Sequence, residues 1–276
     1  MIRDLIRHAK IESIMQDEKL RRAAVRMAID FYNYNQEDYT WAQIQLRYPD
    51  TYADLRQYII SVDLTRALVN QIAKIFQNDP AIEIVGASES IADEFAKLMD
   101  DVNLYSSLRV IDRMAENCNQ VGVAPIYNPR TGKIKLDFIT PDRCVVWQDE
   151  LDPSIATAVA YTIRNRFDTP IAERADVYAL WTDEEYRVVT LKTDGTIDRD
   201  LEPRIKKPYG RIPIVWFAPD MPIDTFWIDR QFPMVDANVR ANIQLTNLDV
   251  ALDFQSFSTF WTSGMPEGQK LTAGVQ

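Results

Sequence analysis

Histidine and cysteine, two residue types that enzymes often use for chemistry, are scarce in this 276-residue chain. His8 is the single histidine, so a histidine-dependent triad or a His-rich metal site has too few members. Cys118 and Cys144 are too few for a disulfide framework and match no zinc spacing. We expect both to be small buried residues of a protein from a reducing compartment. The sequence therefore predicts no catalytic residue, no cofactor and no metal ligand.

Two runs of carboxylates, Asp100-Asp101 and Asp183-Glu184-Glu185, are the candidates for a divalent metal site. Adjacent side chains on a strand or loop point in different directions, which disfavours shared ligation. We interpret both runs as solvated turns, with a metal site as the alternative. Thr131-Gly132-Lys133 lacks the upstream glycine of a phosphate-binding loop. Neither a dinucleotide fingerprint nor a nucleophile elbow occurs.

Composition narrows the class of protein. A hydrophobic content of 46% with 26% charged residues is typical of a folded globular chain, and no apolar run is long enough to span a membrane. The N-terminus lacks the apolar core of a secretory signal. The net charge of −10 argues against a protein that grips DNA tightly, because such proteins neutralise phosphates with Lys and Arg. It does not argue against a passage through which DNA slides.

Helical periodicity dominates the first 120 residues. Residues 1–35 read as an amphipathic helix, either with a solvated polar face or acting as an arm that contacts a protein or nucleic acid. A helix over residues 61–78 is capped by Ser61 and stopped by Asn78-Asp79-Pro80. Its apolar stripe consists of Leu64, Leu68, Ile72 and Ile75. A short strand at 81–85, a helix from Ser88 or Ser90 to Met99 and a helix over 105–120 follow.

An aromatic and amide-rich run, Phe31 to Trp41, has no clear period and is predicted to be an ordered loop. Stacking of single-stranded bases is one function for such rings. Core or subunit packing is the favoured interpretation, because no basic residue lies between Asp30 and Ile44.

The pattern changes to alternation from Val121 onward, which indicates a β-rich region. Turn residues at 128–132 and at Asp194-Gly195 predict two hairpins. The expected strands cover residues 121–127, 133–139, 143–148, 155–165, 177–182, 186–192 and 211–217.

The last long element is a helix over about Met234–Trp261, which is free of Gly and Pro until Gly264. At about 100° per residue it carries two apolar stripes on nearly opposite sides, with polar flanks between them. One stripe holds Val239, Ile243, Val250, Phe254, Phe257 and Trp261, and the other holds Leu245, Leu248, Leu252 and Thr259. Such a helix is either sandwiched inside one fold or placed between identical neighbours in a ring.

The order of these features resembles that of the portal proteins of tailed double-stranded DNA phages. The resemblance rests on four phrases in sequence and covers essentially the whole chain. They are the helix ending at Asn70-Gln-Ile-Ala-Lys-Ile-Phe-Gln-Asn-Asp-Pro80, Phe138-Ile-Thr-Pro-Asp-Arg-Cys-Val-Val146, Gly210-Arg-Ile-Pro-Ile-Val-Trp-Phe217 and the Asp/Asn-rich helix beginning at Val235.

The resemblance implies an α+β fold with a wing and a stem. Residues 1–228 correspond to the wing, with a helical arm at 1–35, helices at 61–120 and a β-rich part at 121–218. Residues 229–262 correspond to the first stem helix and 263–276 to the start of the clip. Family members continue into the rest of the clip, a second stem helix and a crown, which are absent from these 276 residues. We interpret the chain as a truncated portal subunit, with a genuinely short or split portal as the alternative.

The implied function is structural rather than enzymatic. Portal subunits form a homododecameric ring at one capsid vertex, which conducts double-stranded DNA without reading it during packaging and ejection. The implied partners are further copies of the chain, the terminase large subunit, a head–tail adaptor, and the major capsid and scaffolding proteins. The implied location is the virion, after assembly in the bacterial cytoplasm, with no cofactor and no membrane.

Nine residues of the long helix are the predicted subunit interface. They are Val239, Ile243, Leu245, Leu248, Val250, Leu252, Phe254, Phe257 and Trp261. Glutamate at Leu248 or Val250 is expected to disrupt the ring, since it buries a charge at a seam. Two other classes of function stay open at this point, a carboxylate-dependent nuclease and a monomeric protein-binding scaffold. Magnesium-dependent DNA cleavage identifies the nuclease, and the mass in solution identifies the scaffold.

Overall fold

The fold combines helix and sheet, as the predicted α+β class requires. The computed structural model describes residues 19–50, 52–128, 131–163, 177–191, 197–201, 205–206, 210–221, 225–228 and 232–256. The chain divides into two compact units. Unit 1 comprises residues 1–36 and 63–236, and unit 2 comprises residues 37–62 and 237–276. The long C-terminal helix therefore shares a unit with a segment almost two hundred residues earlier in the chain.

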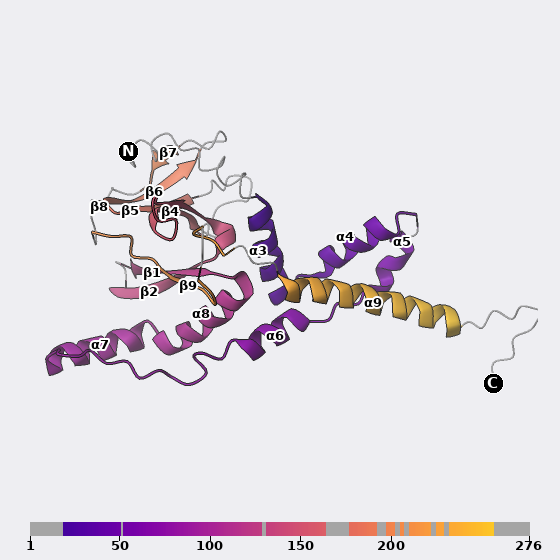
Figure 1. The fold of residues 1–276 in the computed structure, drawn as a ribbon, viewed down its shortest axis with the longest axis horizontal. Helices are drawn as coiled ribbons and strands as arrows, with labels where there is room; N and C mark the ends of the chain where they lie inside the picture. The colour runs from indigo at the N-terminus through magenta and orange to yellow at the C-terminus, as the bar shows by residue number, and fades with distance from the viewer. Residues whose placement is uncertain are drawn as a thin grey trace, which may run out of the picture. The chain divides into compact units, whose positions relative to one another are not determined.

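Unit 1 contains two antiparallel sheets (Figure 1). In the first, β1 (Val121–Asn128) lies between β2 (Lys133–Ile139) and β9 (Val215–Phe217). The second has the order β3 (Cys144–Gln148), β4 (Ala156–Ile163), β5 (Val177–Thr182), β6 (Glu185–Leu191) and β7 (Ile197–Asp200), with β8 (Ile205–Lys206) also paired to β6. The β1–β2 hairpin and the strand 177–182 are confirmed, while Asp194-Gly195 lies outside the described residues.

Strand β9 begins later than predicted, at Val215 rather than at Arg211. Its register places Val123 opposite Val215, so Pro125 falls opposite Pro213. Neither proline has an N–H to donate, and the ladder cannot continue past that pair.

The six-stranded sheet, the three-stranded sheet and a helix form three successive layers of unit 1, with apolar side chains between them. Between the two sheets lies a cluster that includes Ala124 and Ile139 from one sheet and Val159 and Tyr161 from the other. On the far face of the three-stranded sheet, Val121 and Val123 pack against the helix α8 (Leu104–Cys118). The alternation along β1 therefore fills two cores, because successive side chains point to opposite faces.

Gly122 of β1 makes room for a large aromatic neighbour. Its register partner is Trp216, and a Cβ atom at Gly122 would come within 3.0 Å of that indole ring. Trp216 in turn packs edge-on against Phe226 and Trp227, with ring centroids 5.0 and 5.6 Å away. Residue 122 thus has to be small for the aromatic cluster to close over the sheet.

The helices of unit 1 are α3 (Lys19–Tyr32), α6 (Leu64–Ile72), α7 (Glu89–Asp101) and α8. The predicted helices 88–99 and 105–120 are confirmed, with Ser88 at the N-cap position of α7. On α8 the expected face is buried, including Leu108, Ile111 and Ala115. Residues 1–18 of the predicted N-terminal helix lie outside the described residues.

Helix α6 is shorter than the predicted helix over 61–78. Asp63, not Ser61, caps it, because its side chain accepts the Arg66 backbone N–H at 3.2 Å. At the other end, the buried Asp112 of α8 accepts the backbone N–H of Ile75 at 3.0 Å. That tertiary hydrogen bond removes a donor from the helical ladder, and the chain is no longer helical after Ile72. No strand forms at residues 81–85.

The aromatic run at 31–41 is not a loop but the junction of two helices. Phe31 is fully buried near the end of α3, and Trp41 lies within α4 (Glu37–Arg47). Between these two helices, Tyr34 takes a left-handed backbone conformation, with φ of 65°. The prediction failed because one turn between two short helices interrupts the helical period.

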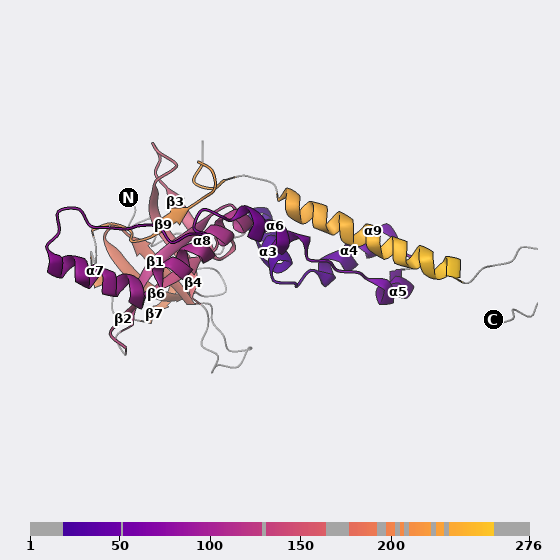
Figure 2. The same cartoon turned by 90° about the horizontal axis from the view of Figure 1, so that it is seen from below.

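Unit 2 consists of α4, α5 (Tyr52–Leu55), the short helix η1 (Arg56–Tyr58), the extended residues 59–62 and most of α9 (Pro233–Ser256). Figure 2 shows α4 and α5 beside α9. Proline at the first position of α9 suits a helix start, where its missing N–H has no helical partner in any case. The helix is 24 residues long within the described residues, and the predicted continuation to Trp261 lies outside them.

Candidate functional site

Helix α9 buries several polar side chains and exposes two leucines. Asn238 and Asn242 are 0% exposed and Thr246 is 1% exposed, whereas Leu248 and Leu252 are each 54% exposed. Asn242 falls between the two predicted apolar stripes, in what was predicted to be a polar flank, yet it lies on the most deeply buried stripe of the helix. A buried amide is stable only where hydrogen bonds satisfy it, so this stripe must have dedicated partners.

Those partners are the backbone groups of residues 60–62. The Asn242 side-chain oxygen accepts the N–H of Val62 at 3.0 Å, and the Asn238 amide donates to the carbonyl of Val62 at 2.8 Å. One turn further along α9, the Thr246 hydroxyl accepts the N–H of Ile60 at 3.0 Å. The Asn242 amide also donates to the Thr40 hydroxyl of α4 at 3.3 Å. Side chains of α9 thus replace the partner strand that an extended segment would otherwise need.

The fit between segment and helix follows from their two repeats. Four residues of an α-helix advance about 6 Å, and two residues of an extended chain advance about 6.6 Å. Asn242 and Thr246 are four residues apart, and their partners Val62 and Ile60 are two apart in the opposite direction. The segment therefore runs antiparallel to α9 in one register, because the following positions along the same stripe carry other side chains.

Tyr58 extends this contact by one further step. Its hydroxyl hydrogen-bonds the carboxylate of Asp253, the next acidic residue after Asp249 on the same side of α9. Loss of hydration at the phenol, that hydrogen bond and the charge of Asp249 raise the pKa of Tyr58 above its ordinary value. The phenol therefore remains a hydrogen-bond donor across the neutral range.

The predicted interface residues differ in exposure. Ile243 is buried, Val239, Leu245 and Val250 are half-buried, and Leu248 and Leu252 are exposed. The side chain of Phe254, and both Phe257 and Trp261, lie outside the described residues. Among the members whose side chains are described, those on the stripe of Ile243 are buried or half-buried, whereas Leu248 and Leu252 on the other stripe are exposed.

The polar stripe was missed as a binding surface in the sequence. Its signal is Asn-x-x-x-Asn-x-x-x-Thr from Asn238 to Thr246, which places three short polar side chains on one face. The extended partner at residues 60–62 carries no such signal, because only its backbone is used.

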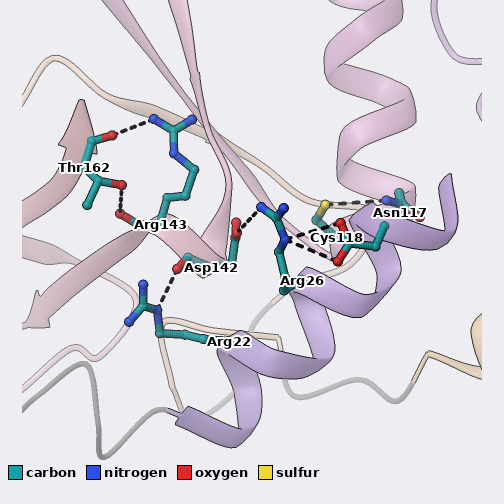
Figure 3. A network of polar contacts seen from close by, with 8 residues as sticks. Arg22, Arg26, Asn117, Cys118, Asp142, Arg143 and Thr162 are labelled. Carbon is teal, nitrogen blue, oxygen red and sulfur yellow. Dashed lines mark hydrogen bonds and ion pairs between the residues drawn. The ribbon is translucent and has the colours of Figure 1, made fainter. Parts of the chain in front are cut away.

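Basic residues of α3 bind the chain's own backbone (Figure 3). Arg22 donates to the carbonyl of Asp142 at 2.6 Å, and Arg21 donates to the carbonyl of Pro141 at 3.1 Å. Arg26 lies 3.9 Å from the buried Asp142 carboxylate and also pairs with Asp30. These contacts hold α3 against the turn of the Thr-Pro-Asp-Arg phrase. Most of the described basic residues of the predicted arm are therefore engaged within unit 1.

The carboxylate runs do not form a metal site in the described part of the chain. Asp101 pairs with Lys133 at 2.6 Å, and Glu185 lies 3.9 Å from Arg187. Across the described ranges, no group of three or more His, Cys, Asp or Glu side chains is placed to hold a metal ion. No helix among the same residues is both long and apolar enough to cross a membrane.

A protein-family model matches most of the chain. The family model described as phage portal protein, SPP1 Gp6-like, matches residues 11–254. No curated protein matches the chain. The matched range contains both units from α3 through Phe254 of α9, including the buried polar stripe and the exposed leucines. Because the match covers far more than half of the sequence, the chain belongs to the SPP1 Gp6-like family of phage portal proteins.

Proposed function

We propose that this protein is a structural subunit of a portal ring, through which DNA passes during genome packaging and ejection. The ring stands at one vertex of the capsid in the virion and is assembled in the host cytoplasm. The subunit has no enzymatic role in this proposal, because energy for packaging comes from a separate motor protein.

One observation carries the proposal, and it concerns the exposed side of α9. Leu248 and Leu252 are each 54% exposed on a helix whose Asn238 and Asn242 are fully buried. Unit 2 therefore buries the side-chain amides of this helix and leaves these two leucines exposed. An apolar stripe left in this way on a long helix favours contact with a further protein surface. When each copy contacts the next through two different surfaces, head to tail, the copies can close into a ring.

Charge supports a passage rather than a clamp. The net charge of −10 gives DNA phosphates little to bind, so a strand can slide without being held. On this proposal the ring is a homododecamer and docks the terminase large subunit, a head–tail adaptor, and the major capsid and scaffolding proteins. DNA contacts the ring without sequence preference.

Mass and shape in solution test the proposal. Light scattering and end-on electron microscopy of the purified chain are expected to show a closed ring of about twelve chains of 31.9 kDa each, with a central opening. A monomer at all concentrations, or cleavage of DNA that depends on magnesium, contradicts it. The monomer favours a protein-binding scaffold, and the cleavage favours a nuclease.

A further inference from the structure

An eight-residue pattern, Leu-x-x-Ala-Leu-x-x-Gln, occurs twice in the chain. It is found at Leu64–Gln71 on α6 of unit 1 and at Leu248–Gln255 on α9 of unit 2. Within each copy the four defined residues are spaced at i, i+3, i+4 and i+7, which places them on one face of a helix about 10 Å long. The two helices therefore carry faces of the same chemistry and the same length.

Both faces point away from the cores of their own units. On α6, Leu64 and Leu68 are 41% and 44% exposed, while the residue that follows each of them, Thr65 and Val69, is fully buried. The α6 stripe was predicted from its periodicity, and the structure leaves it uncovered, including Ile72 at 48%. A helix this short is normally held by its apolar stripe, so the exposure of the leucines and the burial of Thr65 reverse the expected arrangement.

The face on α9 is exposed in the same way. Leu248 and Leu252 are 54% exposed, and Ala251 and Gln255 are exposed beside them. No residue of either four-residue face is charged, in a chain that is 26% charged. Depletion of charge distinguishes the centre of a protein interface from the rest of a surface. The alanine in each face allows two helix axes to approach closely, with the flanking leucines packing around it.

We propose that the α6 face of one copy packs against the α9 face of the next copy in the ring. This inference rests on the proposed ring and names the two surfaces that join its members. The contact is heterologous, because each copy contributes a different helix to each of its two neighbours. An open row of copies then has one unfilled α6 face at one end and one unfilled α9 face at the other until the ring closes. Pairing of like faces, α6 with α6 or α9 with α9, would instead stop at two copies.

Cysteine cross-linking of the full chain tests which faces meet. The native thiols Cys118 and Cys144 are buried, so introduced cysteines are the accessible ones. In Leu68→Cys/Leu252→Cys, oxidation with diamide is expected to yield a ladder of bands at multiples of 31.9 kDa on a denaturing gel. Each step of the ladder is a disulfide formed from two thiols as diamide takes up their electrons and protons. The ladder should disappear on reduction.

Three controls assign the result. Leu68→Cys alone and Leu252→Cys alone are expected to stay at the mass of one chain, and a dimer from either single variant overturns the inference in favour of like-face pairing. Leu68→Cys/Leu151→Cys, in which Leu151 is 95% exposed in a turn outside both faces, is expected to give no ladder. A faster-migrating single chain from Leu68→Cys/Leu252→Cys overturns the inference too, because the two faces then belong to one molecule.

Light scattering on the same samples separates this inference from the proposed function. If rings form and the double variant gives no ladder, the ring proposal stands and the α6–α9 contact is wrong. If no variant and no unaltered chain assembles, the proposed function fails together with the contact.

Discussion

Asn242 and Val62 are joined by a hydrogen bond of 3.0 Å, in which the backbone N–H of Val62 donates to the side-chain oxygen of Asn242. The two residues are 180 positions apart in the chain. Asn238 completes the contact by donating to the carbonyl of Val62. A single extended residue thereby has both of its backbone groups satisfied by one helix. This contact explains why the segment before α6 stays extended until Asp63 caps the helix.

Asn242→Ala is expected to destabilise unit 2. The substitution leaves the Val62 N–H without its acceptor. The Asn238 amide also loses the Asn242 oxygen, to which it donates at 3.2 Å, but keeps the Val62 carbonyl as an acceptor. An unsatisfied buried donor costs about 1–3 kcal/mol. Urea unfolding should show a loss of free energy of unfolding in that range, and hydrogen exchange at the Val62 amide should accelerate. Gln244→Ala on the exposed side of α9 is the control and should change the free energy by less than about 0.5 kcal/mol. Equal losses in both variants would show that the polar stripe contributes nothing specific.

Leu248→Glu is expected to separate assembly from folding. Because Leu248 is 54% exposed in the single chain, glutamate there should leave the melting temperature nearly unchanged. In the ring it buries a charge at a seam, which costs several kcal/mol, so light scattering should report monomers. Val250→Glu should also prevent assembly, but because Val250 is half-buried in the single chain, this variant should lower the melting temperature as well. Leu151→Glu is the control, because it makes the same chemical change away from α9 and should leave the rings intact. Normal rings from Leu248→Glu and Val250→Glu as well would contradict the predicted interface.

Gly122→Ala is expected to lower the stability of unit 1 by about 1–3 kcal/mol, as overpacking of a core does. The new Cβ would lie 3.0 Å from the Cη2 and Cζ3 atoms of Trp216 and 3.2 Å from the Cγ2 atom of Ile214. Thermal unfolding of Gly122→Ala, Trp216→Leu and the double variant forms a mutant cycle. The double variant should lose less than the sum of the two single losses, because the smaller residue 216 accommodates the methyl group. Additive losses would mean that the two residues do not interact.

The thiol of Cys118 is expected to be inert in the folded protein. Burial, with a smaller contribution from the charge of Asp142, raises its pKa to about 12. A thiol reagent at pH 8 should label neither cysteine in the native chain and both after unfolding in guanidinium. The raised pKa favours the folded state below the ordinary thiol pKa of about 8.5, and this contribution is lost as the pH rises from there towards 12. Cys118→Ala should weaken that alkaline loss of stability, and rapid native labelling would contradict the burial.

Local patterns in the sequence were sufficient for elements held by local physics. The β1–β2 hairpin follows from alternation around a turn, and α8 follows from a single apolar face that is indeed buried. The same patterns predicted the two opposed stripes of α9 and the apolar stripe of α6, but not which of them the fold covers. The order of several such phrases, which a linear sequence preserves, carried the resemblance to portal proteins, and the family match over residues 11–254 shows the membership.

Tertiary contacts decided what no local period contains. Helix α6 ends after Ile72, where the Asp112 carboxylate of another helix accepts the N–H of Ile75. The β1–β9 ladder ends at Val123–Val215, and continuing its register would bring together Pro125 and Pro213, which have no N–H to donate. Asn242 reads as a solvated flank residue on a helical wheel, and it becomes the centre of unit 2 because Val62, distant in sequence, brings backbone groups that need a partner. The sequence by itself therefore determined the family and most of the helices and strands, but not α4 or the length of α6. The choice of buried and exposed faces required the three-dimensional structure, because that choice depends on hydrogen bonds between residues far apart in the chain.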